Sequence, residues 1–192
     1  MPEQIAVSLW ADDNATSMLD TILPTYEEVY AEPPYNEGPQ DIADFIDRFR
    51  IQTKRPGFRL ATARQAEEVI GFTFGFLLPP DTRWWRGLLD PKPETFTHEN
   101  GHRTFAIIEL AVRAAWRRHG IARRLHTLLL DGLTAERVTL TMRPEPEAAP
   151  AQAAYASWGY KKLGRTRPWD GAPFYDAMLL EQSNSQVRRS AE

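Results

Sequence analysis

The sequence contains no cysteine, no apolar run long enough to cross a membrane and no internal repeat. Without cysteine there can be no disulfide, thiolate nucleophile or cysteine-ligated metal, and the composition fits a reducing compartment. The longest apolar stretch, Val69 to Leu78, is interrupted by glycine and threonine, and residues 1–11 lack the basic segment and apolar core of a secretory signal. These absences predict a cytoplasmic protein with no membrane partner.

Charge is divided unevenly along the chain. Residues 1–101 carry 9 Lys and Arg against 17 Asp and Glu, whereas residues 102–192 carry 14 against 9. This asymmetry predicts an anionic ligand held by the second half and a cationic one held by the first. The basic residues cluster around one predicted helix start, without a long stripe of interleaved stacking aromatics. Nucleic acid is therefore not an expected partner.

The length and composition predict one globular domain with a sizeable core. The chain has 192 residues, of which 42% are hydrophobic and 26% are charged. We place this domain at residues 1–181 and a polar C-terminal tail at residues 182–192. A homodimer is compatible with the sequence.

Apolar periodicity predicts strands and helices in alternation along the chain. The expected strands are residues 5–11, 58–64, 68–78, 105–112, 138–142, 160–163 and 174–180. The expected helices are residues 16–30, kinked or split at Pro24, residues 41–55, one that begins at Ile121, and one that carries Tyr155. A long irregular connection joins residues 79 to 101, and such loops are often functional. This order predicts an α/β domain with a mixed sheet.

The stretch from Phe105 to Leu130 predicts a buried strand, a short basic loop and an amphipathic helix. The apolar period changes from that of a strand to that of a helix at Gly120, so residues 117–122 lie at a helix N-terminus. The first amides of a helix have no intrahelical partner, and with the helix dipole they attract anions. Gly120 and Ala122 leave these amides open to a phosphate, and the neighbouring arginines add attraction for a polyphosphate.

Three short motifs follow one another from this strand onward. They are L-A-V at residues 110–112, R-x-x-G-x-A at residues 117–122 and Y-x-x-x-G-Y at residues 155–160. In this order and context the chain resembles the GNAT superfamily of N-acetyltransferases. The resemblance implies a single GNAT-like domain with a mixed, mostly antiparallel central sheet, whose central strands splay apart and are flanked by helices. It also implies an N-acetyltransferase reaction with acetyl-CoA as the acyl donor.

The resemblance further implies which residues hold the cofactor and which one acts as an acid. The strand segment would offer backbone groups to the pantetheine arm, and the loop would hold the diphosphate. The implied cofactor-binding residues are Leu110, Ala111, Val112, Arg117, Arg118, His119, Gly120, Ile121, Ala122 and Arg123. Tyr155 matches the tyrosine that family members use to protonate the departing thiolate. The asparagine that often precedes this tyrosine by seven residues is Ala148 here.

The general base is less well defined by the sequence. An alkyl ammonium with a pKa near 10.4 must lose a proton before it can attack a thioester. Glu109, the only carboxylate on the central strand, is the candidate base, although relatives that use a strand carboxylate carry it on the face of Leu110. A structural ion pair between Glu109 and an arginine is the alternative.

An acidic and aromatic set in the first half suits an ammonium by charge and by cation–π attraction. Its members are Tyr26, Glu27, Glu28, Tyr30, Glu32, Tyr35, Trp84 and Trp85. Solvated helix charges and core aromatics explain the same residues. The favoured acceptor is the amine of a small molecule rather than that of a protein.

Two further functions stay open. The same fold could serve as a catalytically idle acyl-CoA-binding or sensory domain, which Ala148 and the undefined base favour. His98, Glu99 and His102 spell the H-E-x-x-H motif of zinc peptidases, but the motif needs both histidines on one helical face, and Asn100-Gly101 is a turn signal. We therefore expect no metal, and we expect His119 in a loop and His126 on a helix surface.

Overall fold

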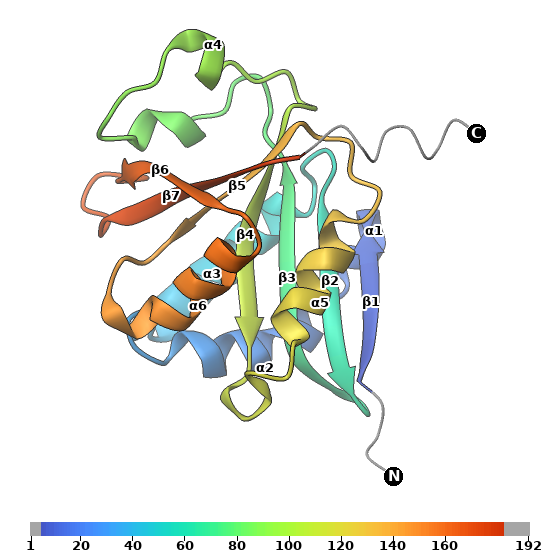
Figure 1. Ribbon diagram of the computed structural model, residues 1–192. Helices are drawn as coiled ribbons and strands as arrows, with labels where there is room; N and C mark the ends of the chain where they lie inside the picture. The colour runs from blue at the N-terminus through green and yellow to red at the C-terminus, as the bar shows by residue number, and fades with distance from the viewer. Residues whose placement is uncertain (1–4, 183–192) are drawn as a thin grey trace. The chain divides into compact units, whose positions relative to one another are not determined.

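The structure is a computed structural model that describes residues 5–182, so the predicted tail after Gln182 lies outside the described residues (Figure 1). Seven strands form a sheet with the order β1-β2-β3-β4-β5-β7-β6. The β1–β2, β2–β3, β5–β7 and β6–β7 pairs are antiparallel, whereas β4 and β5 pair in parallel. This confirms the predicted α/β class with a mixed, mostly antiparallel sheet.

The predicted elements are present with small shifts at their ends. The strands are β1 (Ala6–Ala11), β2 (Arg59–Gln65), β3 (Glu68–Leu77), β4 (Thr104–Val112), β5 (Arg137–Met142), β6 (Lys161–Thr166) and β7 (Tyr175–Glu181). The helices are α1 (Asp12–Thr16), α2 (Leu19–Tyr30), α3 (Pro39–Gln52), α4 (Glu94–Thr97), α5 (Ile121–Leu130) and α6 (Ala149–Ser157). Pro24 lies inside α2, and the predicted helix 16–30 breaks after Thr16 rather than at the proline.

The chain divides into two compact units, one of residues 5–76 and 107–133 and the other of residues 77–106 and 134–182. In the first unit, aromatic rings of α3 pack on one face of β3, with Phe49 and Phe74 edge to face at 5.2 Å between centroids. A Cβ on Gly71 would meet the side chain of Leu125 in α5, so α5 covers the opposite face of β3 (Figure 1). Both faces of β3 are thus buried, which explains its nearly continuous apolar sequence.

Helix α5 buries a wider face than the sequence pattern indicates. Ile121, Leu125 and Leu129 are buried as predicted, but His126 is also buried, with 7% of its surface exposed. The prediction that His126 lies on the helix surface is therefore wrong. Burial, with a smaller contribution from Arg123, lowers the pKa of His126 to about 4, so this imidazole is neutral at pH 7.

In the second unit, β4 and β5 pair from Thr104 to Ala106 and from Arg137 to Thr139. The long excursion before β4 contains a 3-10 turn at Trp84–Gly87 and the short helix α4. Its backbone reaches β6, because Leu89 donates to the carbonyl of Arg165 at 2.9 Å. A Cβ on Gly87 would stand 2.5 Å from the carbonyl oxygen of Arg167, so this close approach requires glycine. None of the helices within residues 5–182 has the length and apolarity needed to cross a bilayer.

Candidate functional site

The loop between β4 and α5 has the backbone geometry of an anion site. Arg118 and Gly120 take positive φ angles of 67° and 75°, and α5 begins directly afterwards. The first helical bond runs from the amide of Arg124 to the carbonyl of Gly120 at 3.1 Å. Among the residues that the structure describes, no backbone or side-chain acceptor is bonded to the amides of residues 118–123. These amides are unpaired within the described residues, as expected at a helix start, and their binding of a diphosphate stays a prediction.

Arg117 ties this loop to neighbouring parts of the protein. Its Nε donates to the carbonyl of Val112 at 3.0 Å, and its Nη1 lies 2.7 Å from the carboxylate of Glu32. The side chain thus ties the loop to the end of β4 and to the segment after α2. The sequence-based prediction gave Arg117 to the cofactor and offered the backbone of Val112 to the pantetheine arm. Arg117 thus has protein partners in the structure, while the assignment of Leu110, Ala111, Val112 and Arg117 to the cofactor stays a prediction.

The exposed residues of the loop are Arg117, Arg118, His119, Gly120 and Arg123. His119 lies in the loop as predicted, with its Nδ1 2.8 Å from the carbonyl of Arg117. An added Cβ on Gly120 would meet no atom within 4 Å, so the space beside this glycine is open. Positive charge around open amides favours a polyanionic ligand.

Glu109 lies on β4 and points toward α2 in the first unit. The phenol of Tyr30 donates a hydrogen bond to its Oε2, and the hydroxyl of Thr73 donates to its backbone carbonyl at 2.7 Å. Burial raises the pKa of Glu109 to about 7, although the Tyr30 hydrogen bond and the charge of Arg48 pull it down. No arginine forms an ion pair with Glu109 among the described residues. A carboxylate with a pKa near the working pH is well suited to act as a general base.

The aromatic residues of α2 surround this carboxylate. The Tyr30 ring lies 4.4 Å from Tyr26 and 4.8 Å from Tyr35 between centroids, and the Tyr26 phenol donates to Glu37 at 2.6 Å. The sequence analysis included the three tyrosines in the acceptor set but missed Glu37. No sequence pattern joins a helix tyrosine to an acid 11 residues further on.

Three other residues of the predicted acceptor set bind partners within the protein. Glu28 pairs with Arg113 at 3.3 Å and Glu32 pairs with Arg117. Trp85 is buried in the second unit, where its indole donates to Glu99 at 3.0 Å. The prediction that Trp85 lines a pocket is therefore wrong.

Tyr155 lies near the C-terminal end of α6 in the second unit, with 8% of its surface exposed. Its ring meets those of Trp158 and Tyr160 edge to face at 5.3 and 5.4 Å. The helix ends at Gly159, whose φ of 94° turns the chain into β6. Ala148 is buried at the start of α6, where it offers only a methyl group.

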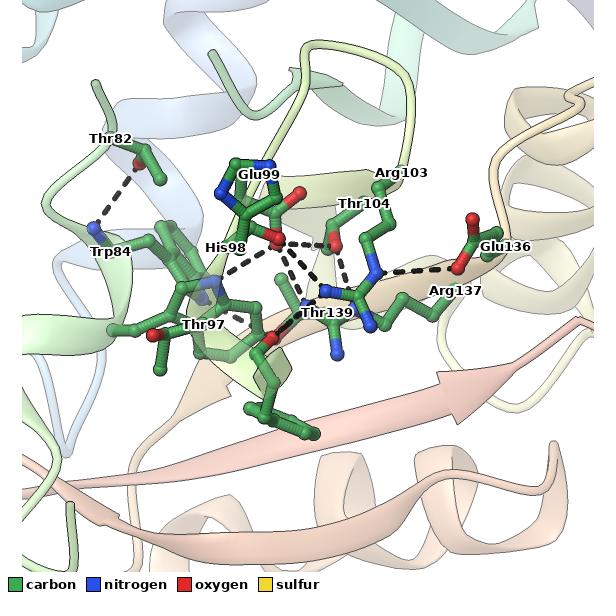
Figure 2. A network of polar contacts seen from close by, with 12 residues as sticks. Thr82, Trp84, Thr97, His98, Glu99, Arg103, Thr104, Glu136, Arg137 and Thr139 are labelled. Atoms are coloured by element: carbon green, nitrogen blue, oxygen red, sulfur yellow. Dashed lines mark hydrogen bonds and ion pairs between the residues drawn. The ribbon is translucent and has the colours of Figure 1, made fainter. Parts of the chain in front are cut away.

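The residues of the zinc motif adopt a loop instead of a helix. Helix α4 ends at Thr97, and Gly101 has a φ of 86°, so His98 and His102 do not share a helical face. Glu99 is buried, and its Oε1 accepts hydrogen bonds from Trp85, from Thr104 at 2.7 Å and from Arg137 at 2.9 Å (Figure 2). This rules out the zinc-peptidase interpretation of the motif, because its glutamate is occupied in a buried ion pair. Within residues 5–182 no three His, Asp or Glu side chains converge as a metal site.

Comparison with known proteins places this geometry in a family. The sequence matches the acetyltransferase (GNAT) family over residues 16–160, and no curated protein matches it. Similar solved structures include PH1933 from Pyrococcus horikoshii OT3, which is 19% identical with a TM-score of 0.63 over 94% of this chain and 99% of that one. The ribosomal-protein-S18-alanine N-acetyltransferase of Escherichia coli is 18% identical with a TM-score of 0.61, covering 94% and 95%. YncA of Salmonella typhimurium, solved with its cofactor acetyl-CoA, is 12% identical with a TM-score of 0.61, covering 93% and 95%.

Proposed function

Because the chain belongs to the GNAT family of acetyltransferases, we propose that it transfers the acetyl group of acetyl-CoA to a primary amine. The observation that carries this proposal is the row of unengaged amides at residues 118–123, which open onto free space at Gly120. A diphosphate accepting from these amides fits the donor that the family uses. YncA, which shares the fold, holds acetyl-CoA in its crystal structure.

The acceptor is proposed to be an amine because of Glu109. An alkyl ammonium has a pKa near 10.4, and a carboxylate whose pKa is about 7 can take its proton at neutral pH. The tyrosines and acids around Glu109 suit a cationic substrate. We favour a small-molecule amine over the amine of a protein, and a protein acceptor such as that of the Escherichia coli neighbour is the second candidate.

The reaction is proposed to be a direct transfer without an acetylated enzyme. Glu109 takes a proton from the ammonium, and the neutral nitrogen attacks the thioester carbon. The tetrahedral intermediate then collapses, the carbon–sulfur bond breaks, and Tyr155 donates its phenolic proton to the departing thiolate. The nitrogen gives up its second proton, which restores the Tyr155 phenol through solvent, and Glu109 releases the first proton to solvent. The products are the amide and free CoA, and no oxidant, reductant or metal is needed to balance the step.

A panel of amines incubated with acetyl-CoA tests the function. We expect CoA release to depend on one class of amine and the product to gain the mass of one acetyl group. Polyamines, amino sugars and aminoacyl amides would represent small acceptors, and short peptides with free N-termini would represent proteins. Tight binding of acetyl-CoA without turnover on any of them would support the idle binding domain instead.

If the loop holds the diphosphate, Gly120→Ala should weaken the binding of CoA. The left-handed φ of 75° strains any L residue, so the substitution should disturb the backbone that presents the loop amides. We expect the Kd for CoA, measured by titration calorimetry, to rise about 10-fold. Gly132→Ala is the matched control, because Gly132 has a φ of 66° and equally open surroundings at the other end of α5. Equal loss in both variants would contradict the assignment.

Replacement of the proposed acid, Tyr155→Phe, should impair turnover far more than cofactor binding. The phenylalanine keeps the ring contacts with Trp158 and Tyr160 but cannot protonate the thiolate. We expect kcat to fall about 100-fold while the Kd of acetyl-CoA stays within about twofold. Tyr160→Phe removes a neighbouring phenol and should leave kcat nearly unchanged. If kcat falls and the Kd of acetyl-CoA rises by a similar factor in Tyr155→Phe, Tyr155 supports binding and is not the acid.

A further inference from the structure

Glu109 is fixed both at its backbone and at its side chain. Its backbone carbonyl accepts from the hydroxyl of Thr73 in β3 at 2.7 Å, which fixes the strand position. Its Oε2 accepts from the phenol of Tyr30 in α2. Within residues 5–182 this phenol is the only donor that bonds to the carboxylate. One oxygen is thus engaged, and the other remains able to accept a proton.

The Tyr30 ring is itself immobilised by its neighbours. It is buried between Tyr26 and Tyr35, at 4.4 and 4.8 Å between ring centroids. Tyr26 in turn stacks on Phe45 of α3 at 3.6 Å, and its phenol is tied to Glu37. This chain of contacts leaves the Tyr30 phenol little freedom, so the direction of its hydrogen bond is set by the packing of α2 on α3.

We propose that Tyr30 is a positioning residue for Glu109: its phenol occupies one carboxylate oxygen and so presents the other to the acceptor ammonium. The inference rests on the proposed function, in which Glu109 is the base. The proton moves from the ammonium nitrogen to the free oxygen of Glu109, and Tyr30 keeps its own proton throughout. Burial and the nearby charge of Glu109 raise the pKa of Tyr30 well above its ordinary value, so the phenol is a donor at every working pH.

The charged and titratable groups around Glu109 predict opposite effects for two substitutions. They are Tyr30 and Tyr26 from α2, Glu37 from the following loop and Arg48 from α3. The Tyr30 hydrogen bond stabilises the ionised carboxylate, so its removal raises the pKa of Glu109. The charge of Glu37 disfavours the ionised carboxylate, so its neutralisation lowers that pKa. A purely packing role for Tyr30 would leave the pKa of Glu109 unchanged in Tyr30→Phe.

The test measures the pKa of Glu109 directly and through catalysis. Carbon-13 NMR of glutamate-labelled protein gives the carboxylate titration without any substrate, and the pH profile of kcat/KM for the acceptor gives the pKa of the working base. We expect Tyr30→Phe to move both values upward by about one unit, so that at pH 7 the ionised fraction falls from about one half to about one tenth. Glu37→Gln should move both downward. Tyr175→Phe is the matched control, because it removes a phenol that interacts with Arg143 rather than with Glu109.

Each outcome distinguishes the positioning role from the proposed function. Parallel upward shifts in the NMR titration and the kinetic profile of Tyr30→Phe, with an unchanged KM for acetyl-CoA, support the proposal. An unchanged NMR pKa overturns it, as does an NMR shift without a shift in the kinetic profile. If the wild-type protein transfers acetyl to no amine, the proposed function fails and this role fails with it, while the NMR shift still shows whether the hydrogen bond exists.

Discussion

Arg137→Met should destabilise the protein by about 3–5 kcal/mol, a large share of the roughly 5–15 kcal/mol that holds a typical domain folded. Arg137 and Glu99 are each only 2% exposed, and their ion pair is 2.9 Å long. The guanidinium also donates to Thr104 and to the carbonyl of Phe96, both at 2.7 Å (Figure 2). Methionine fills much of the same volume but leaves the Glu99 carboxylate buried without its charge partner.

The loss of stability comes from the Glu99 carboxylate, which is left buried without a charge partner, and a double variant tests this origin. Oε2 of Glu99 already has no hydrogen-bond partner among the described residues, so the carboxylate depends on the three donors to Oε1, of which only Arg137 is charged. The double variant Glu99→Leu with Arg137→Met removes both charges. We expect it to recover most of the lost stability, because replacing a whole buried pair by apolar residues is often close to neutral.

Urea unfolding followed by tryptophan fluorescence provides the measurement. Trp85 donates to Glu99, and its ring lies 5.1 Å from the Arg137 guanidinium, so it reports on the network directly. Arg50→Met is the matched control, since Arg50 forms only an exposed pair with Asp47 at 3.6 Å, and such pairs contribute about 0–1 kcal/mol. A loss of stability below about 1 kcal/mol for Arg137→Met, or no recovery of stability in the double variant, would show that the Glu99–Arg137 pair contributes little to holding the segment before β4 in place.

The order of elements could be predicted from the sequence because it depends on local periodicity. The period-two phenylalanines of β3 and the helical spacing in α5 each specify their own element. The loop at residues 117–123 was equally predictable, because a glycine at the change of period specifies an open helix start without reference to distant residues. The cofactor-binding roles of Leu110, Ala111 and the exposed loop residues stay predictions.

The rest could not be predicted because it depends on contacts between residues far apart in sequence. Arg137 and Glu99 are 38 residues apart and Tyr30 and Glu109 are 79 apart, and no pattern in the chain indicates either pair. The H-E-x-x-H motif likewise could not be judged from the sequence alone, because the backbone conformation at Gly101 decides whether its side chains form a site. His126 was misplaced because a helix face can bury one more residue than its apolar stripe indicates.

Glu109→Gln should reduce kcat/KM for the amine about 100- to 1,000-fold near pH 7. Glutamine keeps the size of the side chain and an oxygen for the Tyr30 phenol, but it cannot take a proton from the ammonium. In the wild-type enzyme the acid limb of kcat/KM should lie at about pH 7, the pKa of Glu109, because activity needs the ionised form and is lost as the pH falls through that value. The variant should lack this limb.

The pH dependence of the variant separates a lost base from a damaged site. Without Glu109 the reaction must use the small fraction of amine that is already neutral, and that fraction grows about tenfold per pH unit below the amine pKa near 10.4. The rate of Glu109→Gln should therefore climb steadily and approach that of the wild type near pH 10, with the Kd of acetyl-CoA unchanged. Glu67→Gln, the same substitution at an exposed position, should behave as the wild type throughout. If Glu109→Gln stays within threefold of the wild type at pH 7, or remains equally impaired at pH 10, Glu109 is not the base and the amine proton leaves by another route.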